Sequence, residues 1–184
     1  MMWNPLTRFV AVKANAISSH IPPPPREDTE PPRRILMVHA HPLRDSFSAA
    51  IAAAVTAGAD DGGHSLRRIS LYPQDSSKPY NPVLSSRERS VYYNTSDGKM
   101  RLSAEVRSAL DDLNWCDTLV FVYPTWWFNV PAILKGWLDR TFVPGREGEA
   151  AFDFPGSNTA GPTATGLVPR LTNIQRVAGK MTSA

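Results

Sequence analysis

The sequence contains one cysteine, no long apolar run and almost no excess of charge of either sign. A lone cysteine, Cys116, forms no disulfide framework, which favours a reducing compartment over export. No apolar stretch approaches the roughly 20 residues that a membrane-spanning helix needs. The net charge of +3 over 184 residues gives no basic surface of the kind that binds nucleic acid. These absences favour a soluble chain, and its length suits a single domain with a sizeable core.

Residues 1–34 differ from the rest of the chain in composition. The first 26 residues include basic but no acidic side chains, which is compatible with an organelle presequence. Prolines follow at 22–25 and 31–32, and a segment of this kind stays extended instead of packing into a core. We expect a disordered proline-rich tail or a targeting peptide over residues 1–34 and a folded domain over residues 35–184.

The stretch from Thr118 to Phe142 predicts a strand, a loop and a helix in direct succession. Residues 119–123 form a continuous apolar run of strand composition, which is typical of a strand covered on both faces. Pro131 is predicted as the first helical residue, because its ring already holds a helical φ. One buried helical face follows, with Trp137 favoured as a core residue over a dimer contact; its members are Ile133, Leu134, Trp137, Leu138 and Phe142.

The loop inside this stretch is aromatic. Trp126, Trp127 and Phe128 are consecutive, so they cannot all point into the core. In an open parallel sheet, ligands bind at the carboxyl ends of strands where the connections diverge to opposite faces. We expect this loop to wall a flat, conjugated ligand and to present backbone N–H groups to its polar edge.

A second candidate loop follows the first predicted buried strand, which begins at residues 35–38. Residues 47–59 form an alanine-rich helix with Asp45 or Ser46 as its N-cap, so the first helical N–H groups point back at the strand tip. That arrangement binds anions such as a cofactor phosphate. His41 either donates a hydrogen bond to this ligand or is satisfied by backbone. His39 is interpreted as structural, and no third ligand at suitable spacing supports a metal site.

The remaining pattern completes an alternating α/β order. Strands are predicted at residues 64–71 and 175–181, a helix at 102–113, a long polar loop at 72–99 and a short element within 166–174. Cys116 is interpreted as a packing residue. The loop residues predicted to be solvated surface are Arg87, Glu88, Arg89, Tyr92 and Tyr93.

The segments ILMVHAHPLRDSFS and VYPTWWFNVPAILKGWLDRTF resemble the two signature regions of the flavodoxin-like NAD(P)H:quinone oxidoreductases. The resemblance covers residues 35 to about 180. It implies a three-layer α/β sandwich with a parallel sheet of order 2-1-3-4. It also implies a bound flavin, FAD with FMN as the other candidate, and two-electron transfer from NAD(P)H to a quinone by a ping-pong mechanism. The implied partners are these small molecules and a second copy of the chain, in a cytoplasmic or mitochondrial setting.

The same resemblance implies which residues contact the flavin. His41 matches the phosphate-contacting histidine, and the start of the following helix supplies further contacts. The aromatic loop matches the segment that lies along the isoalloxazine ring. No residue is implied as a nucleophile or a metal ligand. The implied cofactor-binding residues are His41, Ser46, Phe47, Ser48, Pro124, Thr125, Trp126, Trp127, Phe128 and Asn129.

The chain departs from the family pattern near its end. The flavodoxin-like order has five strands, and the sequence predicts four, with Thr182 alone standing for a threonine- and glycine-rich loop that contacts the flavin. A missing strand is expected to leave apolar surface exposed. This departure leaves open a truncated remnant without catalysis, and the family resemblance itself leaves open a regulatory subunit of an ion-efflux system.

Overall fold

The computed structural model describes residues 31–73, 78–91, 102–144, 151–153 and 168–183. From Pro32 onward they belong to a compact unit that runs to Ala184. The predicted tail or targeting peptide lies almost wholly outside the described residues and stays a prediction. Among the described residues, no helix combines the length and the apolar character that crossing a bilayer requires.

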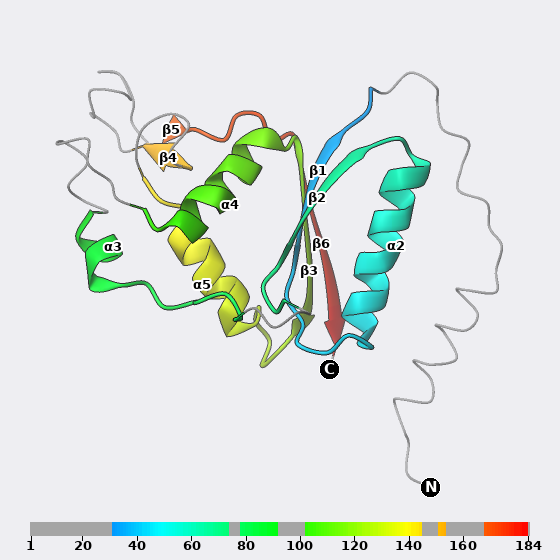
Figure 1. Cartoon of the computed structure of the whole chain (residues 1–184), viewed down its shortest axis with the longest axis horizontal. Helices are drawn as coiled ribbons and strands as arrows, with labels where there is room; N and C mark the ends of the chain where they lie inside the picture. The colour runs from blue at the N-terminus through cyan, green and yellow to red at the C-terminus, as the bar shows by residue number, and fades with distance from the viewer. Residues whose placement is uncertain (1–30, 74–77, 92–101, 145–150, 154–167, 184) are drawn as a thin grey trace, which may run out of the picture. The chain divides into compact units, whose positions relative to one another are not determined.

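The fold is built on a sheet of four parallel strands (Figure 1). These are β1 (Arg34–His39), β2 (Ser65–Ser70), β3 (Thr118–Thr125) and β6 (Arg176–Ser183). Their order in the sheet is β2-β1-β3-β6, which confirms the predicted order 2-1-3-4. The two central strands, β1 and β3, are the most apolar segments of the chain, because both of their faces are covered.

Helices cover the two faces of the sheet and complete a three-layer sandwich (Figure 1). Helix α2 (Phe47–Asp61) lies on one face, while α4 (Ala104–Trp115) and α5 (Ala132–Thr141) lie on the other. Side chains of β1 alternate between the two sides, as the period of a strand requires. Ile35 and Met37 pack in the cluster of α2, and Leu36 and Val38 pack in the cluster of α4 and α5.

Serine caps begin two of the three long helices. The hydroxyl oxygens of Ser46 and Ser103 accept the backbone N–H groups of Ala49 and Val106 at 3.1 and 3.3 Å. Pro131 is also a cap residue, so its prediction as the first helical residue was one position too early. Its φ of −56° suits a helix, but its ψ of 145° is extended, and its carbonyl accepts the first helical N–H bonds.

The polar segment 72–99 was predicted without secondary structure, and this was wrong for one part of it. Helix α3 (Ser86–Val91) forms there. A small antiparallel pair, β4 (Phe152–Asp153) and β5 (Val168–Pro169), lies apart from the main sheet, and β5 falls within the short element predicted at residues 166–174.

Strand β6 forms an edge of the described sheet. Its residues 176–181 are exposed, including the large apolar side chains Val177 and Met181. The sequence predicted apolar exposure of this kind, because parallel strands are normally covered on both faces. Thr182 differs from its neighbours, since its side chain is buried against α2.

Candidate functional site

Two loops meet at the carboxyl ends of β1 and β3, which are neighbours in the sheet. The chain leaves β1 for α2 on one face and leaves β3 for α5 on the opposite face (Figure 1). Connections that diverge in this way leave a crevice at the strand ends, and open α/β sheets bind their ligands there. The structure therefore brings both sequence-predicted loops to one end of the sheet.

The first loop holds His41 in a defined orientation. The backbone N–H of Leu43 donates to Nδ1 of His41 at 3.1 Å, so the ring proton lies on Nε2. The rings of His41 and Trp126 lie 6.3 Å apart at an angle of 59°. This contact joins the two loops directly, and His41 is only half-buried, so its Nε2–H group is placed to serve as a donor.

The start of α2 lies directly after this loop. Ser46 is the N-cap, which selects one of the two predicted capping residues, and its hydroxyl oxygen accepts the Ala49 N–H group. No acidic residue lies in the first turn. No negative side chain in the first turn therefore neutralises the positive end of the helix dipole, which favours an anion at this position. Phe47 is exposed, and the side chain of Ser48 points instead into the protein.

The Ser48 hydroxyl is engaged in a buried contact. It lies 2.9 Å from the hydroxyl of Thr182 at the end of β6, and the two side chains are 1% and 5% exposed. Any contact of Ser48 with an anion at the helix start is therefore expected from its backbone N–H group. Thr182 therefore lies beside the first turn of α2. From the sequence, it was expected only to stand for part of a flavin-contacting loop.

The second loop is a tight two-residue turn. The N–H groups of Trp126 and Asn129 donate to each other's carbonyl oxygens at 3.0 Å. Trp127 and Phe128, the two central residues, have φ of 49° and 61°. Positive φ at both central positions is the type I′ pattern, which normally selects Asn-Gly. Large side chains in this region cost about 1–2 kcal/mol each, so the turn is strained.

The aromatic side chains of this turn face different ways. Trp126 is partly buried against His41, whereas Trp127 and Phe128 are 94% and 99% exposed. The expectation that the three aromatics could not all enter the core is confirmed. Pro124 is buried at the end of β3 and Thr125 pairs with Ser183 of β6, so both serve as the rigid base of the turn.

The turn also determines which backbone donors remain available to a ligand. The N–H groups of Trp126 and Asn129 are used inside the turn. The Asn129 side-chain oxygen accepts the N–H group of Val130 at 2.8 Å. The hydrogen bonds within the turn therefore do not use the N–H groups of Trp127 and Phe128.

Two titratable groups near the sheet are buried, His39, which was interpreted as structural, and Cys116, which was interpreted as a packing residue. His39 is 2% exposed, and neither ring nitrogen has a hydrogen-bond partner among the described residues. Desolvation, followed by the charges of Arg68 and His41, lowers its pKa to about 4. Burial raises the pKa of the Cys116 thiol to about 11, which suits a packing residue and not a nucleophile. The described residues contain no group of three or more His, Cys, Asp or Glu side chains able to hold a metal.

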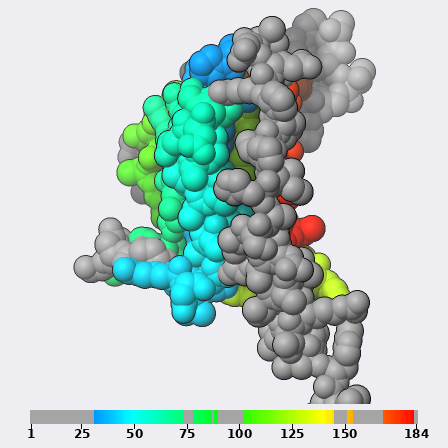
Figure 2. All heavy atoms as spheres, turned by 90° about the vertical axis from the view of Figure 1, so that its right-hand side faces the viewer, coloured from blue at the N-terminus to red at the C-terminus, as the bar shows by residue number. Residues whose placement is uncertain are grey.

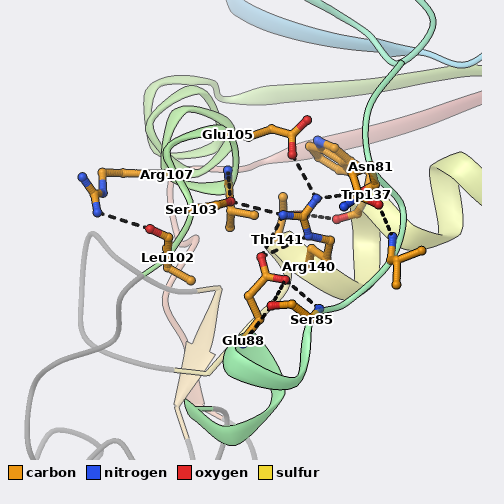
Figure 3. A network of polar contacts seen from close by, with 12 residues as sticks. Asn81, Ser85, Glu88, Leu102, Ser103, Glu105, Arg107, Trp137, Arg140 and Thr141 are labelled. Atoms are coloured by element: carbon orange, nitrogen blue, oxygen red, sulfur yellow. Dashed lines mark hydrogen bonds and ion pairs between the residues drawn. The ribbon is translucent and has the colours of Figure 1, made fainter. Parts of the chain in front are cut away.

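Sequence reasoning missed an ionic network beneath α5, centred on Arg140 (Figure 3). The buried guanidinium of Arg140 donates to Glu88 at 2.8 and 3.1 Å and to Glu105 at 2.9 Å. It also donates to the Ser103 hydroxyl at 3.2 Å and to the Asn81 carbonyl oxygen. Arg140 thus fastens α5 to the starts of α3 and α4.

Glu88 was predicted to be solvated surface, and this was wrong. One carboxylate oxygen binds Arg140, and the other accepts from Ser85 at the start of α3. Burial alone would raise the pKa of Glu88, but the hydrogen bonds from Arg140 and Ser85 outweigh it and lower the pKa. The sequence did carry a signal, since Ser85 followed three residues later by Glu88 is a capping box. Arg89 is exposed as predicted, while Tyr92, Tyr93 and the side chain of Arg87 lie outside the described residues.

Comparison with known proteins agrees with this architecture. The family model described as "flavodoxin-like fold" matches residues 33–172. An uncharacterized NAD(P)H oxidoreductase of Escherichia coli is 36% identical over 112 residues, which cover 61% of this chain and 54% of that protein. The NAD(P)H dehydrogenase [quinone] 1 of Rattus norvegicus is 30% identical over 125 residues, covering 61% of this chain and 44% of the relative.

A solved structure gives the same result. The NAD(P)H:quinone oxidoreductase from Methanothermobacter marburgensis superposes with a TM-score of 0.66 at 25% identity, covering 83% of this chain and 68% of that one. The chain spans about half the length of the curated relatives that it matches. The extent of the family match and the sheet order lead to one conclusion: this chain belongs to the flavodoxin-like fold family.

Proposed function

We propose that this chain binds a flavin nucleotide across the two loops and forms the core of an NAD(P)H:quinone oxidoreductase. The observation that carries the proposal is the contact between His41 and Trp126 at the carboxyl ends of neighbouring strands. It joins a polar loop, suited to phosphate, to an aromatic turn, suited to a conjugated ring. A flavin nucleotide has both parts in one molecule.

The phosphate end of the flavin is assigned to the start of α2. The N–H groups of Phe47 and Ser48 stand at the positive end of the helix dipole, and the helix has no acidic side chain in its first turn to compete. His41 adds the Nε2–H donor that its contact with Leu43 leaves aside. Ser46 fixes the helix start through its cap.

The ring end is assigned to the turn 126–129. Trp126 is held against His41, and Trp127 and Phe128 present exposed aromatic faces. Their two N–H groups are the donors expected to reach the polar edge of the ring system. Donors that are fixed before the reaction stabilise negative charge as it develops, without a cost of reorganisation.

The bound flavin supplies the redox chemistry, in which a hydride from NAD(P)H and a two-electron reduction of a quinone are separated in a ping-pong sequence. The residues of this chain position the cofactor, and the exposed aromatics exclude water from one side of it. The names of the Escherichia coli and rat relatives support NAD(P)H as donor, and the rat and Methanothermobacter relatives support a quinone as acceptor. FAD is our first choice of flavin, FMN is the alternative, and a homodimer is the proposed assembly.

The absorption spectrum of the purified chain tests this function. The chain is mixed with FAD or FMN, passed through a desalting column, and examined between 350 and 500 nm, roughly the range of flavin absorption. We expect retained flavin that is bleached by NADH or NADPH and recovers its colour when menadione is added. Retention of neither flavin would contradict the proposal. Retained flavin that NAD(P)H does not reduce would support a binding role without oxidoreductase activity.

A further inference from the structure

The hydroxyl pair of Ser48 and Thr182 ties the last part of the sheet to the start of α2. The two oxygens lie 2.9 Å apart, although the residues are 134 positions apart in the sequence. In Figure 1 the arrowhead of β6 lies beside the lower end of α2. Figure 2 shows the cyan atoms of α2 on the face turned to the viewer and a few red atoms of the last strand farther to the right. Residues 176–181 of β6 are exposed, so Thr182 is the first residue of this strand whose side chain is buried.

The pair has one proton more than its own hydrogen bond uses. Each hydroxyl carries one proton and can also accept, and a single bond joins them. Among the described residues, no third polar partner of either hydroxyl is found. Both side chains are buried, and a buried hydroxyl group without a partner is unfavourable. Within the described residues, one hydroxyl proton of the pair therefore has no acceptor.

We propose that Thr182, acting through Ser48, is a positioning residue for the phosphate-binding start of α2. The proposal rests on the proposed flavin-binding function. The contact with Thr182 fixes the Ser48 side chain and, with the Ser46 cap, the first turn whose N–H groups face the phosphate. Without the Thr182 hydroxyl, Ser48 is left buried without its partner and turns toward backbone groups of its own helix. The first turn then loses its alignment, while the aromatic turn is unchanged.

Comparing FMN with riboflavin separates positioning from general stability. Riboflavin has the same ring system and lacks the phosphate, so only the affinity for FMN depends on the helix start. Dissociation constants for both are measured by quenching of flavin fluorescence, using the full chain and four variants. These are Thr182→Val, which keeps the shape and removes the hydroxyl, Thr182→Ser, which keeps the hydroxyl, Ser48→Ala, and Thr56→Val as a control. Thr56 donates to the Ala52 carbonyl oxygen in the middle of the same helix.

We expect Thr182→Val and Ser48→Ala each to weaken FMN binding roughly threefold to tenfold, the scale of one hydrogen bond. A fifth variant that combines Thr182→Val with Ser48→Ala should bind FMN no more weakly than either single variant, because both changes remove the same contact. Thr182→Ser should restore FMN binding, and neither riboflavin binding nor the control should change. Equal weakening of FMN and riboflavin in Thr182→Val, or no recovery in Thr182→Ser, would overturn the proposal.

The failure of this proposal can be told apart from the failure of the proposed function. If the unmodified chain binds none of FAD, FMN and riboflavin, the proposed function fails and the role of Thr182 fails with it. If the unmodified chain prefers FMN to riboflavin and Thr182→Val keeps the same preference, only the role of Thr182 is refuted. Circular dichroism and the melting temperature confirm that each variant is folded before its affinity is compared.

Discussion

The two loops at the carboxyl ends of β1 and β3 are built in opposite ways. The loop of His41 is relaxed: its histidine accepts from the backbone two residues on, and the helix that follows has a regular serine cap. The aromatic turn is strained, because Trp127 and Phe128 hold positive φ. Both residues also expose almost all of their side-chain surface. Both loops have their own hydrogen bonds, but only the aromatic turn holds large side chains at positive φ.

This difference indicates where function outweighs stability. An exposed aromatic pair in a turn that suits Asn-Gly gains little from the folded chain itself. Strain of this kind persists where the surrounding structure enforces it, and it is concentrated at functional sites. The polar loop is accounted for by its own hydrogen bonds, whereas the aromatic turn would be accounted for by the flavin that we propose it binds.

The largest expected effect concerns neither loop but the buried ionic network at the end of α5, the helix that follows the aromatic turn. Replacing Arg140 by Met should lower the free energy of unfolding by about 3 kcal/mol or more, because Glu88 stays buried without its partner. Lys135→Met on the same helix is the control, since its ion pair with Asp139 is exposed and should change stability by less than about 0.5 kcal/mol. Urea unfolding measures both. Similar losses in the two variants would refute the anchoring role of Arg140.

Strand β1, which leads into the polar loop, is expected to be sensitive to acid through its last residue, His39. The folded-state pKa of His39 is about 4, below its ordinary value of 6.5, so the unfolded chain binds more protons between these values. The contribution of neutral His39 to the free energy of unfolding should be fully present above pH 6.5. It should be lost as the pH falls toward 4, by up to about 3 kcal/mol. Thermal melts across this range should show the fall in the natural chain and a smaller one in His39→Leu. An equal fall in both would show that other groups cause it.

The strain in the aromatic turn can be removed directly. Changing Trp127 to Asn and Phe128 to Gly should raise the free energy of unfolding by about 2 kcal/mol, since these residues suit positive φ. Riboflavin affinity should fall more than about tenfold, because base-aromatic stacking is worth about 1–3 kcal/mol. Val83→Asn, an exposed apolar residue elsewhere, is the control. A more stable chain with unchanged flavin affinity would mean that the turn serves another purpose.

The smallest expected effect belongs to the donor of the polar loop. His41→Ala should weaken FMN binding roughly threefold to tenfold and leave riboflavin binding unchanged, because only the phosphate needs the Nε2–H group. His41→Gln keeps an N–H donor and should recover part of the affinity. Titrations followed by flavin fluorescence measure both. Loss of riboflavin affinity in His41→Ala would place His41 against the ring and not the phosphate.

The sequence predicted the parts of the fold that depend on local periodicity. Apart from α3, the strands and helices from Arg34 to Thr141 follow apolar patterns, and the sheet order follows from the alternation of strands and helices. Helix α3 was missed because it is short and polar, although its capping box from Ser85 to Glu88 was present. Polarity was taken as exposure there, and the buried partner of Glu88 lies 52 positions away.

The geometry of the site was less predictable than its location. The two loops could be placed at one end of the sheet, because parallel strands end at the same edge. The turn at Trp127 and Phe128 could not be foreseen, since type I′ turns are identified by asparagine and glycine. The contact between Ser48 and Thr182 depends on the register of β3 with β6, which no local pattern specifies.

The central claim is that the polar loop and the aromatic turn bind one flavin nucleotide together. The most direct measurement is a ¹H–¹⁵N correlation spectrum of the assigned chain during titration with FMN and, separately, with riboflavin. FMN should shift the amide signals of Phe47 and Ser48 together with those of Trp127 and Phe128, at one common dissociation constant. Riboflavin should shift the turn alone. FMN shifts confined to other surfaces, or to only one of the two loops, would contradict the account.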